Sequence, residues 1–225
     1  MPGPAAPADL SRTWAIVPIR GLETAKTRLG GDLDAEERRD LVVDLLRRTL
    51  VATRDATRLC GTIVVTMDPA AAGIARDHHA VGLVERAPGL NGAIEAARSL
   101  ALARGATAVL VLPADLPAIS ADAVDRVVDA AERAAGEGTR PNAGQPARGV
   151  VALVTDRHGT GTNALLVSPP ALIDPQFGPG SRDLHRASAV AAGAAVLELD
   201  GALTLDVDTA EDLVAAEAAM GALRG

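Results

Sequence analysis

The sequence predicts a doubly wound α/β fold with a mostly parallel central sheet and helices on both faces. Short apolar runs of strand length alternate with stretches whose apolar residues recur at helical spacing. The run 108–112 is apolar without a break, as expected of a central parallel strand covered on both faces. At 225 residues and 48% hydrophobic content, the chain can form one large domain or two small ones with a substantial core.

Each predicted strand is an apolar run bounded by proline, glycine or polar residues. The first strand ends at Pro18, and the clearest one ends at Pro113. The predicted strands are residues 13–18, 62–66, 81–84, 108–112, 150–154, 164–167 and 195–199. A short extended segment, residues 205–209, completes the fold.

The predicted helices fill the gaps between these strands. Asp34 and Glu37 have the spacing of a capping box, which begins an amphipathic helix that runs to about Asp55. The others are a short alanine-rich helix after Pro69, helices at about 88–104 and 182–192, a helix that begins at Ser120, and a closing helix at 210–220.

The composition excludes several classes of protein. A net charge of -7 and the lack of a basic stretch argue against a nucleic-acid binder. One Trp, one Phe and no Tyr also leave no aromatic platform for stacked bases. Cys60 is the single cysteine, so there is no intrachain disulfide or thiolate metal centre, and we expect a small buried side chain.

The domain organisation is predicted to be simple. Residues 1–12, rich in Pro and Ala, have the composition of a disordered tail rather than a signal peptide. Residues 13–225 form the domain, and the Gly-, Pro- and Arg-rich segment 136–149 is expected to be a mobile surface loop. No apolar run reaches the length that spans a membrane, so we expect a cytoplasmic protein.

The loop after the first predicted strand contains the chain's only lysine, Lys26, together with Arg20 and Arg28. A lysine ammonium is a compact charge that can follow a moving phosphate, whereas a planar guanidinium imposes its own geometry. The loop therefore either faces phosphates or is a solvated surface loop with one incidental lysine. No P-loop sequence is present, which argues against a P-loop NTPase.

Carboxylates follow at two later places. Asp115 comes directly after the strand at 108–112, where ligands of open α/β sheets bind; the alternative is a helix cap or a solvated turn. Asp206 and Asp208 alternate with apolar residues on one side of an extended segment, although one of them could instead support a last helix capped by Thr209. Next to Asp115, either would complete a magnesium site, because Mg²⁺ takes a few carboxylates plus phosphate oxygens. Such a site, with Lys26 facing the phosphates, catalyses phosphoryl or nucleotidyl transfer by positioning and charge neutralisation.

Seven segments together resemble a known family. They are residues 17–20, 25–29, 89–93, 114–117, 161–165, 177–181 and 206–209. They are similar to the 2-phospho-L-lactate guanylyltransferase family of coenzyme F420 biosynthesis, within the MobA-like nucleotidyltransferases, from Trp14 almost to the end of the chain. The resemblance implies a single-domain, Rossmann-like nucleotidyltransferase fold. One departure is Ile19-Arg20, where the family often has a lysine after Val-Pro.

The resemblance also implies the reaction and the roles of residues. A phosphorylated three-carbon acid would attack the α-phosphorus of GTP, and pyrophosphate would leave. Pro18, Lys26 and Arg28 would hold GTP, with Gly89 and Asn91 beside the guanine. Asp115 with Asp206 or Asp208 would bind Mg²⁺, and the acid would be received by Thr162, Asn163, Gly178 and Ser181.

Two of the residues on the acid side have alternative interpretations. Ser181 opens a predicted helix, whose free N–H groups suit an anion, or it is a simple N-cap. His185 either lines the acid site or belongs to a polar helix face with Arg182 and Arg186.

We therefore expect a magnesium-dependent guanylyltransferase, monomeric or homodimeric, that acts on GTP and passes its product to a downstream deazaflavin transferase. The arginine- and alanine-rich composition resembles that of high-GC actinobacteria, whose members of the family are associated with phosphoenolpyruvate. Phosphoenolpyruvate is thus favoured over 2-phospho-L-lactate, and 3-phospho-D-glycerate stays open. The alternatives are a related transferase of the CTP or molybdopterin type, and a catalytically inactive nucleotide-binding regulator.

Overall fold

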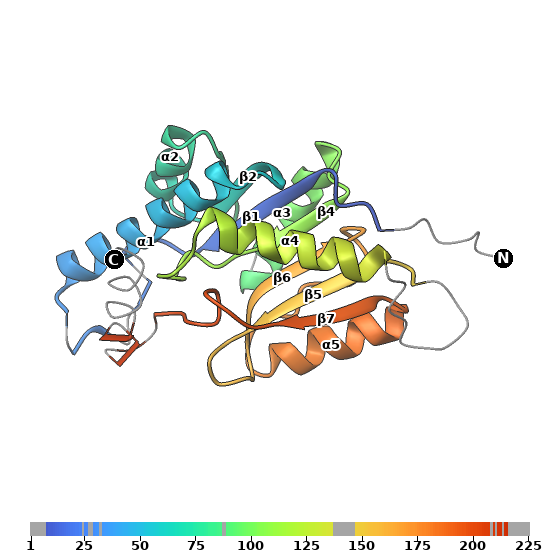
Figure 1. The fold of residues 1–225 in the computed structure, drawn as a ribbon. Helices are drawn as coiled ribbons and strands as arrows, with labels where there is room; N and C mark the ends of the chain where they lie inside the picture. Colours follow the sequence, from blue (N-terminus) through green and yellow to red (C-terminus); the bar gives the residue numbers. More distant parts are fainter. Residues whose placement is uncertain are drawn as a thin grey trace.

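The computed structural model describes residues 8–23, 25–26, 29–31, 33–86, 89–136, 147–207, 209, 211–212 and 214–215. In this part of the chain the strands form one seven-stranded sheet in the order β3-β2-β1-β4-β6-β5-β7 (Figure 1). The strands are β1 (Thr13–Ile19), β2 (Leu59–Thr66), β3 (Val81–Val84), β4 (Ala108–Val111), β5 (Val150–Thr155), β6 (Thr162–Ser168) and β7 (Ala195–Leu199). Strand β6 runs antiparallel to both of its neighbours and all other pairs are parallel, which confirms the predicted mostly parallel sheet.

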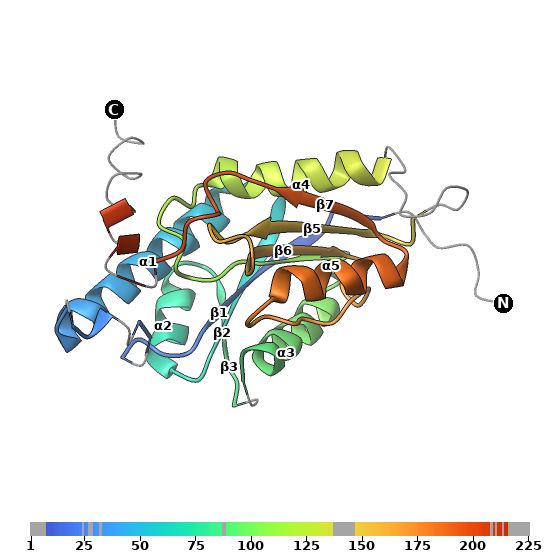
Figure 2. The ribbon, with the colours of Figure 1, turned by 90° about the horizontal axis from the view of Figure 1, so that it is seen from below.

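The helices cover both faces of the sheet. They are α1 (Ala35–Asp55), α2 (Pro69–Asp77), α3 (Gly89–Ala103), α4 (Ala121–Gly136) and α5 (Ser181–Ala192). Figure 2 shows α4 on one side of the sheet and α3 and α5 on the other. Helices α1 and α2 share the side of α4, because the same face of β1 packs against all three. None of the helices in the described part of the chain is both long and apolar enough to cross a membrane.

The side chains of β1 show how the two halves of the core are divided. Ala15 lies in the cluster that contains α4, and Val17 lies in the cluster of α1 and α2. Ile16, between them, packs with α3 on the opposite face. Successive side chains of a strand point to opposite faces, so a central strand needs apolar residues throughout. The continuous apolar runs of the sequence are explained by this two-sided burial.

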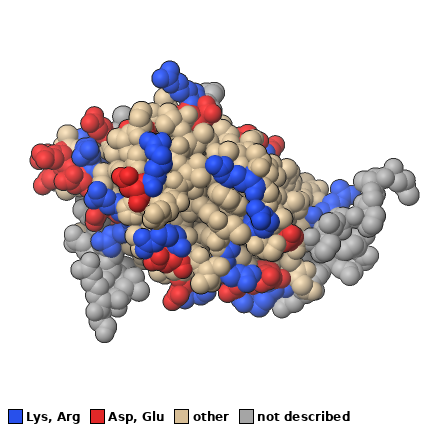
Figure 3. All heavy atoms as spheres, turned by 90° about the horizontal axis from the view of Figure 1, so that it is seen from above, with Lys and Arg blue, Asp and Glu red and all other residues tan. Residues whose placement is uncertain are grey.

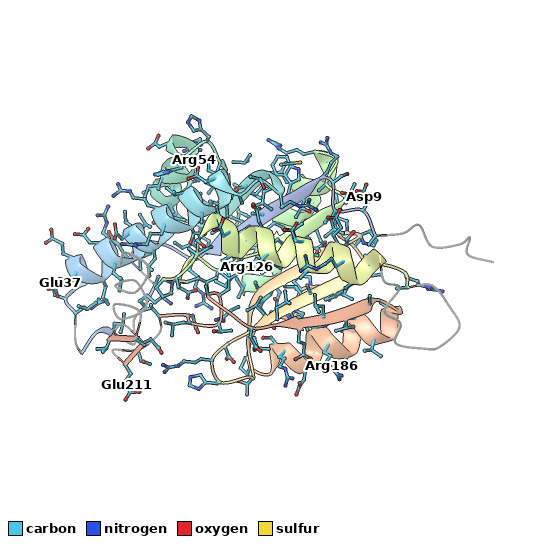
Figure 4. All side chains as sticks on the ribbon, in the orientation of Figure 1. Asp9, Glu37, Arg54, Arg126, Arg186 and Glu211 are labelled. Carbon is cyan, nitrogen blue, oxygen red and sulfur yellow. The ribbon has the colours of Figure 1, made fainter. Side chains whose placement is uncertain are left out.

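The predicted capping box of α1 is present. The Asp34 carboxylate accepts hydrogen bonds from the backbone N–H groups of Glu36 and Glu37, at 2.8 and 2.9 Å. The Glu37 carboxylate accepts one from the Asp34 N–H at 2.8 Å, and Figure 4 labels Glu37 at the start of α1 and Arg54 near its end. This cap holds the beginning of α1, and with it the end of the loop that carries Lys26.

Charged side chains of both signs are interspersed on the face that Figure 3 shows. No extended field of one sign is visible on this face.

The prediction of a disordered tail over residues 1–12 is corrected for residues 8–12. Leu10 is 4% exposed and belongs to the core cluster of α4. The Arg12 guanidinium donates hydrogen bonds to the carbonyls of Gly105 and Arg104, at 2.7 and 2.9 Å. Residues 1–7 lie outside the described residues. So do residues 137–146 of the predicted mobile loop, whose mobility remains a prediction.

Cys60 is exposed, so the expectation of a buried cysteine was wrong. Strand β2 begins at Leu59, three residues before the predicted start at 62, and its burial begins only at Thr62. The first residues of β2 extend beyond the helical cover, where the thiol lies 3.6 Å from the Ser11 carbonyl oxygen.

Candidate active site

The strand order reverses at the carboxyl ends of β1 and β4, and we call this edge of the sheet the crevice. Strand β1 lies between β2 and β4, so the chain leaves it in one direction toward β2 and β3 and later returns on the other side. Ligands of open α/β sheets bind where the strand order reverses in this way. The loop after β1 carries Lys26, and Asp115 follows β4. Because β6 is antiparallel to β4, its first residues, Thr162 and Asn163, lie at this same edge.

Lys26 and Asp115 form an ion pair across this crevice. The Lys26 ammonium donates to Asp115 Oδ2 at 2.5 Å, and only 8% of the lysine side chain is exposed. Lys26 has a φ of 58°, in the left-handed region that few residues other than glycine adopt. Its carbonyl accepts a hydrogen bond from Leu29, whose side chain is buried against Leu45 and Val207. The lysine is thus part of a packed loop rather than a solvated one. Arg28 lies outside the described residues.

The second oxygen of Asp115 fits a metal ligand. Oδ1 is buried and accepts no hydrogen bond from the described residues. A buried carboxylate oxygen without a partner is costly, and a hard cation would satisfy it. The described residues hold no group of three or more His, Cys, Asp or Glu that could ligate a metal by themselves. A cation here would therefore use few protein carboxylates, as Mg²⁺ does when phosphate oxygens complete its shell.

The segment that contains Asp206 packs against the Asp115 loop. The Val207 N–H donates to the Asp115 carbonyl at 3.1 Å. The Asn163 side chain donates to the Thr204 carbonyl at 3.0 Å and to Asp206 Oδ1 at 3.3 Å. Asn163, predicted to receive the acid, thus holds Asp206 in place, and its contact with a substrate stays a prediction. Asp208 lies outside the described residues, and metal binding by either aspartate stays a prediction.

Thr209 caps the last helical turn of the described chain, because its hydroxyl accepts a hydrogen bond from the Asp212 N–H at 3.3 Å; support of this turn by Asp206 or Asp208 stays a prediction. Its N–H and hydroxyl donate to Asp212 Oδ2, at 2.7 and 2.8 Å. Arg157, in the loop between β5 and β6, pairs with Asp212 Oδ1 at 2.7 Å. The segment after Asp206 is therefore tied to the β5–β6 loop.

A cleft of about 810 Å³ opens beside β1, on the side of β2. Its lining includes Pro18, Arg20, Met67, Asp68, Gly89 and Leu90. Asp68 accepts hydrogen bonds from the backbone N–H groups of Leu22 and Ala70, at 3.0 and 2.8 Å, and so joins the loop after β1 to the start of α2. The Leu22 hydrogen bond is the main cause that lowers the pKa of Asp68. The cleft has the size of a small-molecule site.

Two of the residues predicted to contact GTP, Pro18 and Gly89, line this cleft, as does Arg20. Asn91 makes a different contact. Its amide donates to the Phe177 carbonyl at 3.1 Å, and its Oδ1 accepts from the Phe177 N–H at 2.8 Å. Both ends of the Asn91 side chain therefore hold the loop before α5, and its contact with guanine stays a prediction.

Ser181 is the first residue of α5 and is 2% exposed. The N-cap is Gly180, with a φ of 72° and no side-chain hydrogen bond to the helix, so the interpretation of Ser181 as a simple N-cap was wrong. Gly178, with a φ of 137°, accepts a backbone hydrogen bond from Ser181 at 3.1 Å. The Arg182 N–H also has a partner, the Thr160 carbonyl at 3.3 Å, so an anion at this helix start would have to use the N–H groups that follow Arg182 or the Ser181 hydroxyl.

His185 is fully buried one turn after Ser181 on the same helix. Its Nδ1 lies 3.0 Å from the Thr162 hydroxyl, and its Nε2 accepts a hydrogen bond from the Gln176 N–H at 2.8 Å. Its ring also meets Phe177 edge-on, with 4.9 Å between centroids. Spacing of four residues from Ser181 is the sequence signal that places both side chains on one face of α5.

Arg182 and Arg186 lie on a different face of α5. They pair with Glu198 of β7, at 2.7 and 3.1 Å, and Figure 4 labels Arg186 on α5. The interpretation of His185 as part of a polar helix face with these arginines was therefore wrong.

Burial lowers the pKa of His185 to about 4. The unfolded chain takes up a proton near pH 6.5 while the folded chain does not, so the neutral ring stabilises the fold above that pH. The free energy of unfolding should fall by about 1.4 kcal/mol per pH unit between pH 6.5 and 4, a total of about 3 kcal/mol. Urea unfolding at several pH values measures it. His185→Gln should lack this slope, whereas the exposed His158→Gln should keep it; equal slopes in all three proteins would contradict the assignment.

Arg98 supports the same loop and was missed by the sequence analysis. Its side chain is 9% exposed and pairs with Glu95 and Asp174, at 2.5 and 3.0 Å. It also donates to the Ile173 carbonyl at 2.7 Å. Helix α3 thus anchors the segment that leads to Phe177 and Ser181. An arginine within an alanine-rich helix carries no sequence signal of such a role.

Comparison with known proteins agrees with this architecture. The family model described as "Guanylyl transferase CofC like" matches residues 13–217. The chain is 39% identical to a phosphoenolpyruvate guanylyltransferase of Sphaerobacter thermophilus, over 93% of this chain and 96% of the relative. It is 38% identical to the protein of that name in Rubrobacter xylanophilus, over 92% of this chain and 95% of the relative.

Solved structures show the same fold. A nucleotidyl transferase from Methanothermobacter thermautotroptrophicus matches with a TM-score of 0.61 and 13% identity, over 94% of this chain and 99% of the other. The 4-diphosphocytidyl-2C-methyl-D-erythritol synthase of Anaerococcus prevotii matches with a TM-score of 0.57 and 11% identity, over 95% of this chain and 100% of the other. The fold is that of nucleotidyltransferases. Because the family model matches residues 13–217 and these two relatives are 39% and 38% identical over most of both chains, the chain belongs to the CofC-like guanylyl transferase family.

Proposed function

We propose that this enzyme transfers GMP from GTP to the phosphate of phosphoenolpyruvate, with release of pyrophosphate, as a step of coenzyme F420 biosynthesis. The names of its relatives favour phosphoenolpyruvate over 2-phospho-L-lactate. The structural observation that carries the proposal is the Lys26–Asp115 pair at the crevice, beside a buried Asp115 oxygen that accepts no hydrogen bond from the described residues. A cation and a carboxylate in contact there suit a triphosphate and its metal.

The two substrates would bind on opposite sides of Asp115. The cleft with Pro18 and Gly89 would take the guanosine, so that the triphosphate reaches Lys26 and, by its position in the sequence, Arg28. The acid would lie by Thr162, Gly178 and Ser181, with its anionic groups toward the start of α5.

Catalysis in this arrangement comes from positioning and charge neutralisation. The acid's phosphate is itself the nucleophile, so no protein side chain has to form a covalent bond. Mg²⁺ held by Asp115, with Asp206 or Asp208, would supply charge neutralisation of the phosphates. Lys26 would add a second positive charge, which the released pyrophosphate needs as it forms.

The experiment is incubation with GTP, Mg²⁺ and one acid at a time, coupled to the downstream deazaflavin transferase and followed by mass spectrometry. We expect the phosphoenolpyruvate-derived product in largest yield, with 2-phospho-L-lactate and 3-phospho-D-glycerate as the comparison acids. Preferential use of CTP would replace the guanylyl assignment. No turnover of any nucleotide, with GTP still bound, would indicate a nucleotide-binding regulator.

The product would pass to that transferase, in the cytoplasm, where GTP and phosphoenolpyruvate are both available. This partner and this location are part of the proposal, as is a monomeric or homodimeric enzyme.

A further inference from the structure

We infer that His185 is a positioning residue that makes the Thr162 hydroxyl an obligate hydrogen-bond donor toward the acid. The inference rests on the proposed function, because it assumes that Thr162 contacts the acid. His185 is fully buried and does not itself contact the acid. It acts through Thr162 and through Gln176.

The protonation state of the ring follows from its two neighbours. The Gln176 backbone N–H can only donate a hydrogen bond. Its nitrogen lies 2.8 Å from Nε2, so Nε2 is the acceptor. A neutral imidazole with an acceptor at Nε2 carries its hydrogen on Nδ1. Nδ1–H then donates to the Thr162 hydroxyl oxygen, 3.0 Å away. If Nε2 carried the hydrogen instead, it and the Gln176 N–H would be two donors facing each other at 2.8 Å.

This arrangement determines what Thr162 can offer a ligand. A hydroxyl has one hydrogen and two lone pairs, and His185 occupies one lone pair. The hydroxyl hydrogen is thereby turned away from the ring, and in the described part of the chain the hydroxyl makes no other hydrogen bond. Thr162 is only 7% exposed, so this donor is largely shielded from water, and such a donor suits a phosphate or carboxylate oxygen.

The same ring links the two segments that would contact the acid, the start of β6 and the loop before α5. Thr162 begins β6, while Gln176 precedes the Phe177–Ser181 loop, and the ring bonds to one on each of its nitrogens. Phe177 packs edge-on against the ring, and Ser181 lies on the same face of α5. The distance between Thr162 and the start of α5 is thus set by a rigid five-membered ring.

Two substitutions separate the two hydrogen bonds. An Asn side chain can place an N–H near the position of Nδ1, and a Gln side chain can place an acceptor near Nε2. We expect His185→Asn to keep the donor to Thr162 and to change the KM for the acid by less than about threefold. His185→Gln loses that donor and should raise the KM for the acid roughly tenfold or more, with the KM for GTP unchanged.

The double variant tests whether the effect passes through Thr162. Thr162→Val removes the hydroxyl, so His185→Gln in this background should change the KM for the acid by less than about twofold. Multiplicative effects of the two substitutions, or an unchanged KM for the acid in folded His185→Gln, would overturn the inference. The exposed His158→Gln serves as the matched control and should behave as the parent.

A measurement on the unsubstituted enzyme applies even where a variant does not fold. The ¹⁵N chemical shifts of the His185 ring at pH 7 should show hydrogen on Nδ1 and none on Nε2; the opposite tautomer would overturn the inference. The parent enzyme's turnover of GTP with phosphoenolpyruvate tests the proposed function separately. If turnover is absent but the tautomer is the expected one, the proposed function is rejected, whereas the orientation of the Thr162 hydroxyl by the ring is still supported.

Discussion

Asp115→Asn should lower kcat/KM for guanylyl transfer by on the order of 10³-fold while the protein stays folded. Asparagine keeps the shape of the side chain but removes the charge that pairs with Lys26 and would hold the metal. The buried Oδ1 would no longer belong to a carboxylate. Steady-state pyrophosphate release measures the loss. Asp122→Asn, exposed in the first turn of α4, is the control and should retain parental activity.

Replacement of Mg²⁺ by other divalent ions tests whether Asp115 binds the metal or only pairs with Lys26. In Asp115→Cys, the hard carboxylate is replaced by a soft thiolate, which binds Mg²⁺ poorly and softer divalent ions better. We expect activity lost with Mg²⁺ and partly restored with Mn²⁺ or Cd²⁺. Asp115→Asn should not respond to these ions. Parental activity of either variant with Mg²⁺ would remove Asp115 from the site.

Lys26→Met should lower kcat/KM by on the order of 10²-fold, because the charge beside the triphosphate is lost with little change in volume. Lys26→Arg should recover only a minor part, since a larger planar guanidinium cannot replace a compact ammonium that is 8% exposed and paired with Asp115. The loss should appear with GTP as the varied substrate. Arg126→Met, at an exposed position of α4 (Figure 4), is the control for loss of a cation.

An outcome in which Lys26→Arg equals the parent would mean that the site needs a positive charge and no particular geometry. An outcome in which Lys26→Met equals the parent would exclude Lys26 from phosphate binding. The thermal unfolding temperature of each variant shows whether the fold survived.

The local elements of the fold could be predicted because their signals are local. The capping box at Asp34 and Glu37 lies within one helical turn and predicts where α1 begins, and the helical spacing of apolar residues predicts its end near Asp55. The apolar run of β4 is continuous because both of its faces are covered. The order of strands in the sheet and the antiparallel direction of β6 depend on contacts between distant segments. The spacing of residues within one segment carries no information about strand order or strand direction.

The candidate site was predictable in part for the same reason. Asp115 stands out because it follows the clearest strand, and Lys26 because it is the only lysine. Their pairing joins positions 89 residues apart, which the rule for ligand sites at strand ends anticipates only in general terms. The buried state of His185 was not predictable, because the Thr162 and Gln176 groups that satisfy its ring come from other elements.

The packed residues 8–12 and the exposed Cys60 show the limit of composition as a guide. Leu10 is buried because the chain passes over the end of the sheet near α4, and Cys60 is exposed because β2 extends past its cover. Each outcome depends on where the neighbouring elements end.

In the proposed reaction, one acid molecule displaces pyrophosphate from GTP at the crevice between β1 and β4. The direct test is a time course of GTP, phosphoenolpyruvate and Mg²⁺ with the enzyme, in which pyrophosphate and orthophosphate are measured together. We expect pyrophosphate to appear only when both substrates are present, in amounts equal to the acid consumed. Orthophosphate and GDP as the products, or pyrophosphate released without the acid, would contradict it.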